Sequence, residues 1–277
     1  MSVPFRVPDP QQVAEIIRRV AAEEILPRFN KLEKADISEK QSGEIVTAAD
    51  VASERRLVAE LTAILPGSVV VGEEGYAADA ACIEHLTRAA PVWIIDPVDG
   101  TRNFAEGRGI FGVIVALAVD GDTVAGWIYD PLGDDMMWGI AGEGAWDATG
   151  RLKLPPLVPR LEAMRGSVAK RPRERLEEMG KRGQGPVPRE MLRYRCVARE
   201  YMHLVRGHLD FAVYGQLKPW DHAAGVLLYA EAGGYSAYTE TDKLYRPGPV
   251  QENSRYILAP NAARWGEIRD LIQAALN

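Results

Sequence analysis

Cysteine and histidine are scarce in this chain of 277 residues. Cys82 and Cys196 are its only cysteines, too few for a disulfide framework and too far apart for a Cys-x-x-Cys motif. The four histidines show none of the spacings typical of a zinc site. The composition therefore predicts neither redox chemistry nor zinc binding.

Long hydrophobic runs and a surplus of positive charge are also lacking. No stretch of about 18 consecutive apolar residues occurs, and the N-terminus has no positively charged segment followed by an apolar core. We therefore expect a cytoplasmic protein that does not bind a membrane. The 33 basic and 39 acidic side chains give a net charge of −6, which argues against binding to a nucleic-acid polymer.

Apolar residues make up 47% of the chain, enough for a large core, and they follow helix and strand patterns. A capped helix is expected after Asp9-Pro10, and a second from about Asp50. An antiparallel meander is expected from Ile110 to Trp146, with a tight turn at Asp120-Gly121. These patterns indicate a mixed α/β (α+β) fold.

A proline-rich segment, from Pro155 to Pro159, marks a boundary between two parts of the chain. We expect an N-terminal α+β subdomain, residues 1–155, that carries most of the candidate ligands described below. Residues 156–277 are expected to form an α/β subdomain, and the two are expected to make one compact catalytic unit.

The most informative motif is the run Trp93–Thr101, in which three apolar residues precede two carboxylates, a bend and a hydroxyl. Pro97 and Gly100 allow a sharp turn after a buried strand. Oxygen ligands of the kind that Mg²⁺ prefers would then converge, namely Asp96, the Val98 carbonyl, Asp99 and the Thr101 hydroxyl. If Asp99-Gly100-Thr101 also begins a helix, its free N–H groups would bind phosphate. Without further context, a solvated turn is the alternative.

Two other acidic positions are candidates. Glu73 and Glu74 follow an apolar strand at a sheet edge, where ligands of α/β sheets bind, although they are equally compatible with ordinary loop acids. Asp221 lies at the start of an expected helix and is either its N-cap or a metal ligand. The neighbouring His222 is expected to stabilise the local turn.

Four motifs in order resemble those of the inositol monophosphatase superfamily of magnesium-dependent, lithium-sensitive phosphatases. They are Ile45–Asp50, Gly72–Glu74, Trp93–Thr101 and Trp220–Gly234. The resemblance implies a layered α-β-α-β-α sandwich of the sugar phosphatase type, usually assembled as a homodimer. It also implies two to three Mg²⁺ ions and a small phosphorylated substrate.

The resemblance assigns roles residue by residue. The first Mg²⁺ would be held by Glu73, Asp96 and the Val98 carbonyl, and the second by Asp96, Asp99 and Asp221, while Glu73 would support a third ion through water. The catalytic residues would be Asp50, Glu73 and Thr101, and the phosphate would lie at Asp99, Gly100 and Thr101. Thr101 coupled to Asp50 is similar to the family's water-activating pair, which implies direct attack by metal-activated water without a phosphoenzyme.

The substrate is less constrained, because the chain departs from the family pattern in three places. Arg195–Ala198 stands where many relatives have a Gly-Ser/Thr-Ala-Ala segment, and Tyr214 stands where inositol phosphatases have a glutamate. Lys40 matches the family's loop lysine only approximately. A phosphorylated polyol or sugar is expected, with 3′(2′),5′-bisphosphate nucleotides, fructose 1,6-bisphosphate and histidinol phosphate as alternatives.

Several side chains near these departures have two interpretations. A second anionic group could bind to basic side chains, which are equally well explained as surface charges: Arg193, Arg195, Arg199 and Lys218. Trp220 and Tyr214 could stack on a ring or pack in the core. A metal-binding regulatory protein is the non-enzyme alternative, but the complete set of acidic residues argues against it, because clustered carboxylates without a metal repel one another.

Overall fold

The computed structural model describes residues 5–40, 42–87, 90–249 and 254–276. The two N-terminal helices confirm the sequence patterns. In α1 (Pro10–Val20) the Asp9 carboxylate accepts a hydrogen bond from the Gln11 N–H at 2.9 Å, as an N-cap does. The second helix, α2 (Ala48–Ile64), begins two residues earlier than expected, because Thr47 is its N-cap and Asp50 closes a capping box.

The larger sheet has seven strands, in the order β3-β4-β5-β6-β7-β8-β9. Its strands are β3 (Val69–Gly72), β4 (Val92–Asp99), β5 (Gly112–Val119), β6 (Asp122–Asp130), β7 (Asp135–Ile140), β8 (Gly144–Asp147) and β9 (Gly150–Leu152). Only β3 and β4 run parallel, and β4 to β9 form an antiparallel meander. The predicted turn at Asp120-Gly121 is confirmed, and both residues have positive φ, at 52° and 78°, as a tight hairpin turn requires.

The smaller sheet has five strands, in the order β11-β10-β12-β14-β13. Its strands are β10 (Arg165–Val168), β11 (Glu190–Leu192), β12 (Phe211–Tyr214), β13 (Tyr235–Tyr238) and β14 (Tyr256–Ala259). The helices of this half are α5 (Lys170–Lys181), α6 (Val197–Val205), α7 (Pro219–Glu231) and α8 (Ala262–Leu276).

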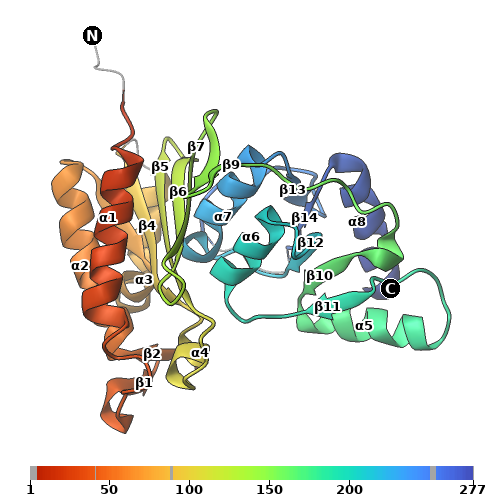
Figure 1. Cartoon of the computed structure of the whole chain (residues 1–277), viewed down its shortest axis with the longest axis horizontal. Helices are drawn as coiled ribbons and strands as arrows, with labels where there is room; N and C mark the ends of the chain where they lie inside the picture. The colour runs from red at the N-terminus through yellow and green to blue at the C-terminus, as the bar shows by residue number, and fades with distance from the viewer. Residues whose placement is uncertain (1–4, 41, 88–89, 250–253, 277) are drawn as a thin grey trace.

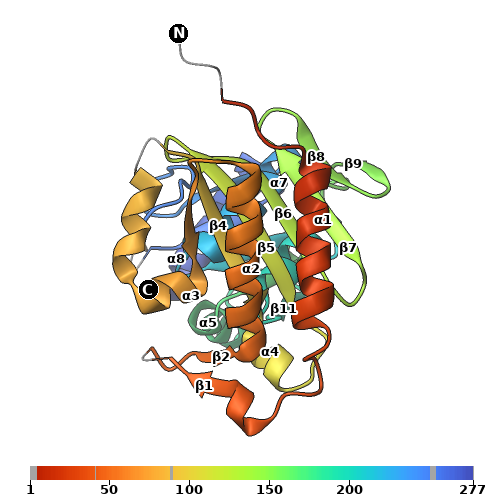
Figure 2. The ribbon, with the colours of Figure 1, turned by 90° about the vertical axis from the view of Figure 1, so that its left-hand side faces the viewer.

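The elements stack in five layers, as Figure 1 shows. One core cluster joins α1 and α2 to the near face of the larger sheet, whose strands lie behind these helices in Figure 2. A second cluster places α6 and α7 between the two sheets, and a third packs α5 and α8 against the far face of the smaller sheet. This order confirms the predicted α-β-α-β-α sandwich. None of the helices in the described ranges has both the length and the apolar character needed to cross a membrane.

Short elements occupy the connections near one end of the larger sheet. They are the hairpin β1 (Ile37–Glu39) and β2 (Ile45–Thr47), the helices α3 (Glu73–Ala78) and α4 (Thr101–Ala105), the π-helical turn Ala21–Ile25, and the 3₁₀ segments Lys34–Asp36 and Ala80–Thr87. Glu73 and Glu74 therefore begin a helix and do not lie in a loop. A further 3₁₀ segment, Leu161–Ala163, precedes β10 and packs with the smaller sheet.

Small residues let α7 approach its neighbours closely. A Cβ on Gly126 of β6 would lie 2.8 Å from the Cα of Ala224, and a Cβ on Gly225 would lie 2.1 Å from the Tyr201 ring of α6. Both distances are too short for a real side chain, so glycine is required at each position. This close packing fixes the start of α7, which carries Asp221, over the larger sheet.

Candidate active site

The end of β4 carries the first two acidic side chains of the site. Pairing between β4 and β5 shifts register between Asp96 and Asp99, so the strand bulges where Pro97 interrupts its N–H donors. Asp96 accepts a hydrogen bond from the Val98 N–H at 3.1 Å. Asp96 is 2% exposed and Asp99 is 7% exposed, so both carboxylates are held in the interior by the strand itself.

Gly100 makes the turn that follows. Its φ is +88°, and a Cβ there would lie 2.9 Å from the Ile110 carbonyl oxygen and 3.2 Å from the Cys196 Cβ. The predicted helix after this turn is α4, which begins at Thr101 and is only five residues long. Buried Asn103 of α4 donates its side-chain amide to the carbonyl oxygen of Tyr194 at 3.0 Å. The turn is thereby tied to the segment that precedes α6.

The Thr101 hydroxyl lies between two acceptors. It is 3.0 Å from the Asp50 Oδ1 and 3.0 Å from the Val98 carbonyl oxygen, and it has one proton to donate. Asp50 also accepts hydrogen bonds from the Thr47 hydroxyl and from the Thr47 N–H at 2.9 Å. Burial raises the pKa of Asp50 to about 6, although the Thr47 hydrogen bonds oppose the rise.

Lys40 enters the site from the turn of the β1–β2 hairpin. Its ammonium is 2.8 Å from the Glu73 Oε1 and 2.7 Å from the Glu74 Oε1, and its side chain is only 8% exposed. Burial lowers the pKa of Lys40, but the two carboxylates outweigh burial, and the net effect is a raised pKa. Lys40 is therefore a charged partner of Glu73. The sequence alone left the role of Lys40 open, because it matches the family's loop lysine only approximately.

Glu54 is a structural part of the site that the sequence analysis missed. Its carboxylate accepts hydrogen bonds from the N–H groups of Glu74 at 2.9 Å and Gly75 at 2.7 Å, and so holds the first turn of α3. A Cβ on Gly72 would lie 2.4 Å from the Glu54 Cδ, which explains the glycine. Burial raises the pKa of Glu54 to about 7. The sequence held one signal for Glu54: it lies four residues after Asp50, and so on the same face of the expected helix.

Asp221 completes the acidic group from the opposite layer. It is the third residue of α7, and Lys218 occupies the N-cap position, so the N-cap alternative for Asp221 is wrong. A cavity of about 230 Å³ brings together six of the sequence-predicted positions. They are Glu73, Asp96, Asp99, Gly100, Thr101 and Asp221. Asp50 and the Val98 carbonyl join this cavity through the Thr101 hydroxyl.

Negative charges accumulate in this cavity. Burial raises the pKa of Asp96, Asp99 and Asp221, and repulsion from neighbouring carboxylates adds to the rise. Asp99 is partly stabilised by the Ala198 N–H, which donates to its Oδ2 at 2.6 Å. Buried carboxylates that repel one another call for a cation, and an all-oxygen donor set fits a hard divalent ion such as Mg²⁺.

The acidic side chains are not preassembled around one point. Within the described ranges, no three Asp, Glu, His or Cys side chains are gathered closely enough to form a metal site as they stand. Glu73 is instead engaged by Lys40. A cation bound by Glu73 would therefore lie close to the Lys40 ammonium and be repelled by it, and the assignment of individual ligands remains a prediction.

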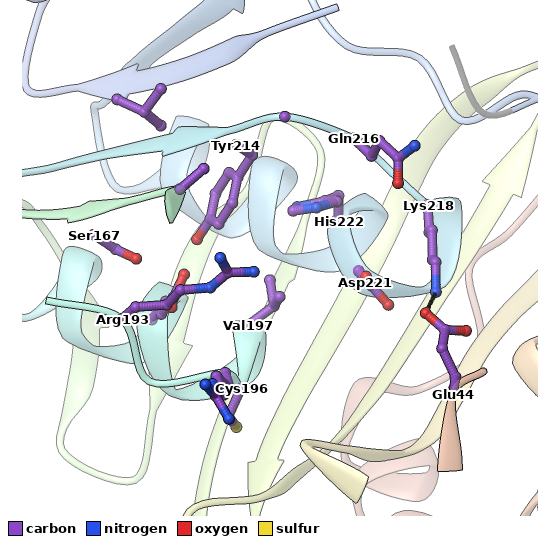
Figure 3. A pocket seen from close by; sticks show the side chains of 15 residues that line it. Glu44, Ser167, Arg193, Cys196, Val197, Tyr214, Gln216, Lys218, Asp221 and His222 are labelled. Carbon is purple, nitrogen blue, oxygen red and sulfur yellow. Dashed lines mark hydrogen bonds and ion pairs between the residues drawn. The ribbon is translucent and has the colours of Figure 1, made fainter. Parts of the chain in front are cut away.

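A second cavity, of about 440 Å³, adjoins the first and shares Glu44, Arg195, Lys218 and Asp221 with it. Figure 3 shows Tyr214 and Arg193 pointing into this space. Trp220 does not line it, and packs at a ring-centroid distance of 4.9 Å against Tyr76.

Other polar side chains around this cavity are held by partners. His222 lies 3.0 Å through its Nδ1 from the Tyr201 hydroxyl, and burial lowers the His222 pKa to about 3. Arg199 is paired with Asp130 at 2.6 Å and does not line the cavity, which favours the surface-charge interpretation of Arg199 over anion binding.

Comparison with known proteins gives consistent matches over nearly the whole chain. A sequence model of the inositol monophosphatase family matches residues 9–276. An inositol-1-monophosphatase of Caulobacter vibrioides is 30% identical over 270 residues, covering 93% of this chain and 98% of the relative. A fructose-1,6-bisphosphatase/inositol-1-monophosphatase of Aquifex aeolicus is 30% identical over 237 residues, covering 80% of this chain and 83% of the relative.

A solved structure shares the fold. The IMPase of Thermotoga maritima superposes with a TM-score of 0.78 at 23% identity, over 95% of this chain and 96% of that one. The layered sandwich and the four ordered motifs therefore agree with the family match, and this chain belongs to the inositol monophosphatase family of phosphatases.

Proposed function

We propose that this protein is a Mg²⁺-dependent phosphomonoesterase that hydrolyses a small phosphorylated polyol or sugar by direct attack of water. The observation that carries the proposal is one cavity that combines four acidic side chains with a hydroxyl coupled to a buried carboxylate. The acidic side chains are Glu73, Asp96, Asp99 and Asp221, and the coupled pair is Thr101 and Asp50.

Two to three Mg²⁺ ions held by Glu73, Asp96, the Val98 carbonyl, Asp99 and Asp221 would polarise the phosphate, lower the pKa of water and stabilise the leaving oxygen. In the proposed scheme the substrate phosphate lies at Asp99, Gly100 and Thr101, where the chain turns into α4. The alcohol part of the substrate lies in the adjoining 440 Å³ cavity.

The chain's own groups orient and deprotonate the attacking water. The Thr101 hydroxyl donates a hydrogen bond to Asp50, which leaves the Thr101 oxygen free to accept a hydrogen bond from water. The water then attacks phosphorus as its proton passes toward the Thr101–Asp50 pair. The bond between phosphorus and the ester oxygen breaks, the ester oxygen takes a proton from a solvent water to give the alcohol, and the pair returns its proton to solvent. Thr101 alone is a poor base, so the carboxylate is an essential partner.

The first test is phosphate release from four esters: inositol 1-phosphate, fructose 1,6-bisphosphate, histidinol phosphate and 3′-phosphoadenosine 5′-phosphate. Release should require Mg²⁺, stop with a chelator and fall with lithium. Asp96→Asn should lose release, whereas Asp270→Asn, on the exposed face of α8, is the matched control. No release of phosphate while Mg²⁺ is bound would favour the metal-binding regulatory alternative.

Two further parts of the proposal have separate tests. Acid quenching during turnover of a ³²P-labelled ester should leave the protein unlabelled, and a labelled protein would contradict direct attack by water. We also propose that residues 1–155 and 156–277 act as one catalytic unit that assembles as a homodimer. Light scattering after gel filtration should then give twice the chain mass of 30.5 kDa.

A further inference from the structure

We propose that the 440 Å³ cavity selects substrates that carry a second acidic group, a phosphate or a carboxylate, and that Arg193 and Arg195 bind this group. The inference rests on the proposed phosphatase function, because the first phosphate must lie in the carboxylate cavity. It concerns a different part of the substrate, and so can fail while the phosphatase function stands.

The partners of the basic side chains single out these two arginines. Lys218 is paired with Glu44, which satisfies the one lysine of the cavity. Arg193 and Arg195 also line the cavity, and neither guanidinium makes a hydrogen bond or ion pair with any residue that the structure describes; the Arg195 backbone carbonyl accepts from Asn103 at 3.3 Å. A free guanidinium presents a planar fork of donors that matches a carboxylate or phosphate.

The backbone at Arg195 supports a specific placement. Arg195 has a φ of +55°, a left-handed conformation that favours glycine and is strained for an arginine. The segment is held there because Asn103 donates to the Tyr194 carbonyl and Ala198 donates to Asp99. Arg195 is thereby fixed where the two cavities meet, and it lines both the 440 Å³ cavity and the carboxylate cavity in which the phosphate is proposed to lie.

The buried Tyr214 hydroxyl is a further polar group on the cavity wall. Figure 3 shows it directed into the cavity beside Arg193. The hydroxyl interacts with the Glu200 carboxylate, which contributes to the raised pKa of Tyr214. An anionic oxygen bound to Arg193 would offer Tyr214 a second acceptor.

The acidic residues of the cavity do not cancel this positive charge. Glu44 is neutralised by Lys218, and Asp221 belongs to the proposed metal cavity. Glu200 remains, buried on the cavity wall and accepting a hydrogen bond from the Tyr194 N–H at 3.2 Å. One carboxylate therefore faces two guanidinium groups, and this carboxylate is already engaged by the Ser167 and Tyr214 hydroxyls.

Non-hydrolysable phosphonates test the inference without turnover. Calorimetry in the presence of Mg²⁺ would compare each alkylphosphonate of three to six carbons with the phosphonocarboxylate and the bisphosphonate of equal length. A charge-assisted hydrogen bond contributes about 1.5–3 kcal/mol, so the best diacid should bind at least about tenfold more tightly than its monoacid. The series with the larger gain in affinity, phosphonocarboxylate or bisphosphonate, identifies the second acidic group as a carboxylate or a phosphate.

Substitutions assign the gain to the two arginines. Arg193→Gln and Arg195→Gln should each lower the diacid-to-monoacid affinity ratio by about tenfold. Arg189→Gln is the matched control, because Arg189 is an exposed arginine of the same segment outside the cavity. Equal affinities for diacids and monoacids, or a ratio that survives both substitutions, would overturn the inference. Failure of the phosphate-release assay would instead count against the proposed function.

Discussion

Glu200 is expected to make the protein less stable as the pH rises. The residue is 3% exposed, and burial raises its pKa from 4.5 to about 6, although the nearby Ser167 and Tyr214 hydroxyls oppose the rise. The folded state then holds a proton that the unfolded state has released between these two pKa values. The contribution of Glu200 to the free energy of unfolding is therefore largest below pH 4.5 and is lost as the pH rises through 6. The loss is about 2 kcal/mol in total.

Glu200→Gln removes the titrating group but keeps an oxygen that can accept the Tyr194 N–H. Of the total effect, about 1 kcal/mol develops between pH 5 and pH 8. Urea unfolding of both proteins in chelator should therefore show the variant gaining about 1 kcal/mol relative to the parent over that interval. Glu15→Gln, on the exposed side of α1, controls for loss of a charge. A difference between Glu200→Gln and the parent that does not change with pH would refute the buried, titrating carboxylate.

Substitutions at four other positions have defined outcomes. Asp96→Asn should lower kcat at least about 100-fold and weaken Mg²⁺ binding measured by calorimetry, because both proposed ions share this ligand. Thr101→Ala should lower kcat by about 100-fold, and Thr101→Ser should recover most of it, since only the hydroxyl is required. Tyr214→Glu should lower the preference for diacid substrates, measured as a ratio of kcat/KM values, because it adds a negative charge beside Arg193. Gly225→Ala should lower the free energy of unfolding by about 1–3 kcal/mol in urea denaturation, because the new methyl group meets the Tyr201 ring.

Local signals were sufficient to predict much of the fold. The turn at Asp120-Gly121 and the motif at the end of β4 were predictable because a few adjacent residues determine each. Thr47 and Asp50 form a capping box that spans only four residues. The start of α2 was nevertheless predicted two residues too late, because Asp50 is the third residue of the helix and Thr47 is its N-cap.

Contacts between distant segments were not predictable in the same way. Glu54 holds α3 from 20 residues away, and Lys40 meets Glu73 from 33 residues away. A single sequence does not show which distant residues lie close together in space. An exposed charged residue therefore cannot be told from a buried one that has a partner. Arg199 was left with two interpretations for the same reason, since its pairing with Asp130 becomes visible only once β6 and α6 are packed together.

The ion pairs of Lys40 would couple the proposed metal binding to the β1–β2 hairpin. An ammonium that already neutralises Glu73 opposes a second cation, so a metal ion bound by Glu73 would share this carboxylate with Lys40 or displace the lysine. The metal affinity would then include a free-energy cost for weakening the lysine contact. A change that only loosens or tightens the hairpin, far from every proposed ligand, would alter the Mg²⁺ concentration at which the proposed metal cavity is half-saturated.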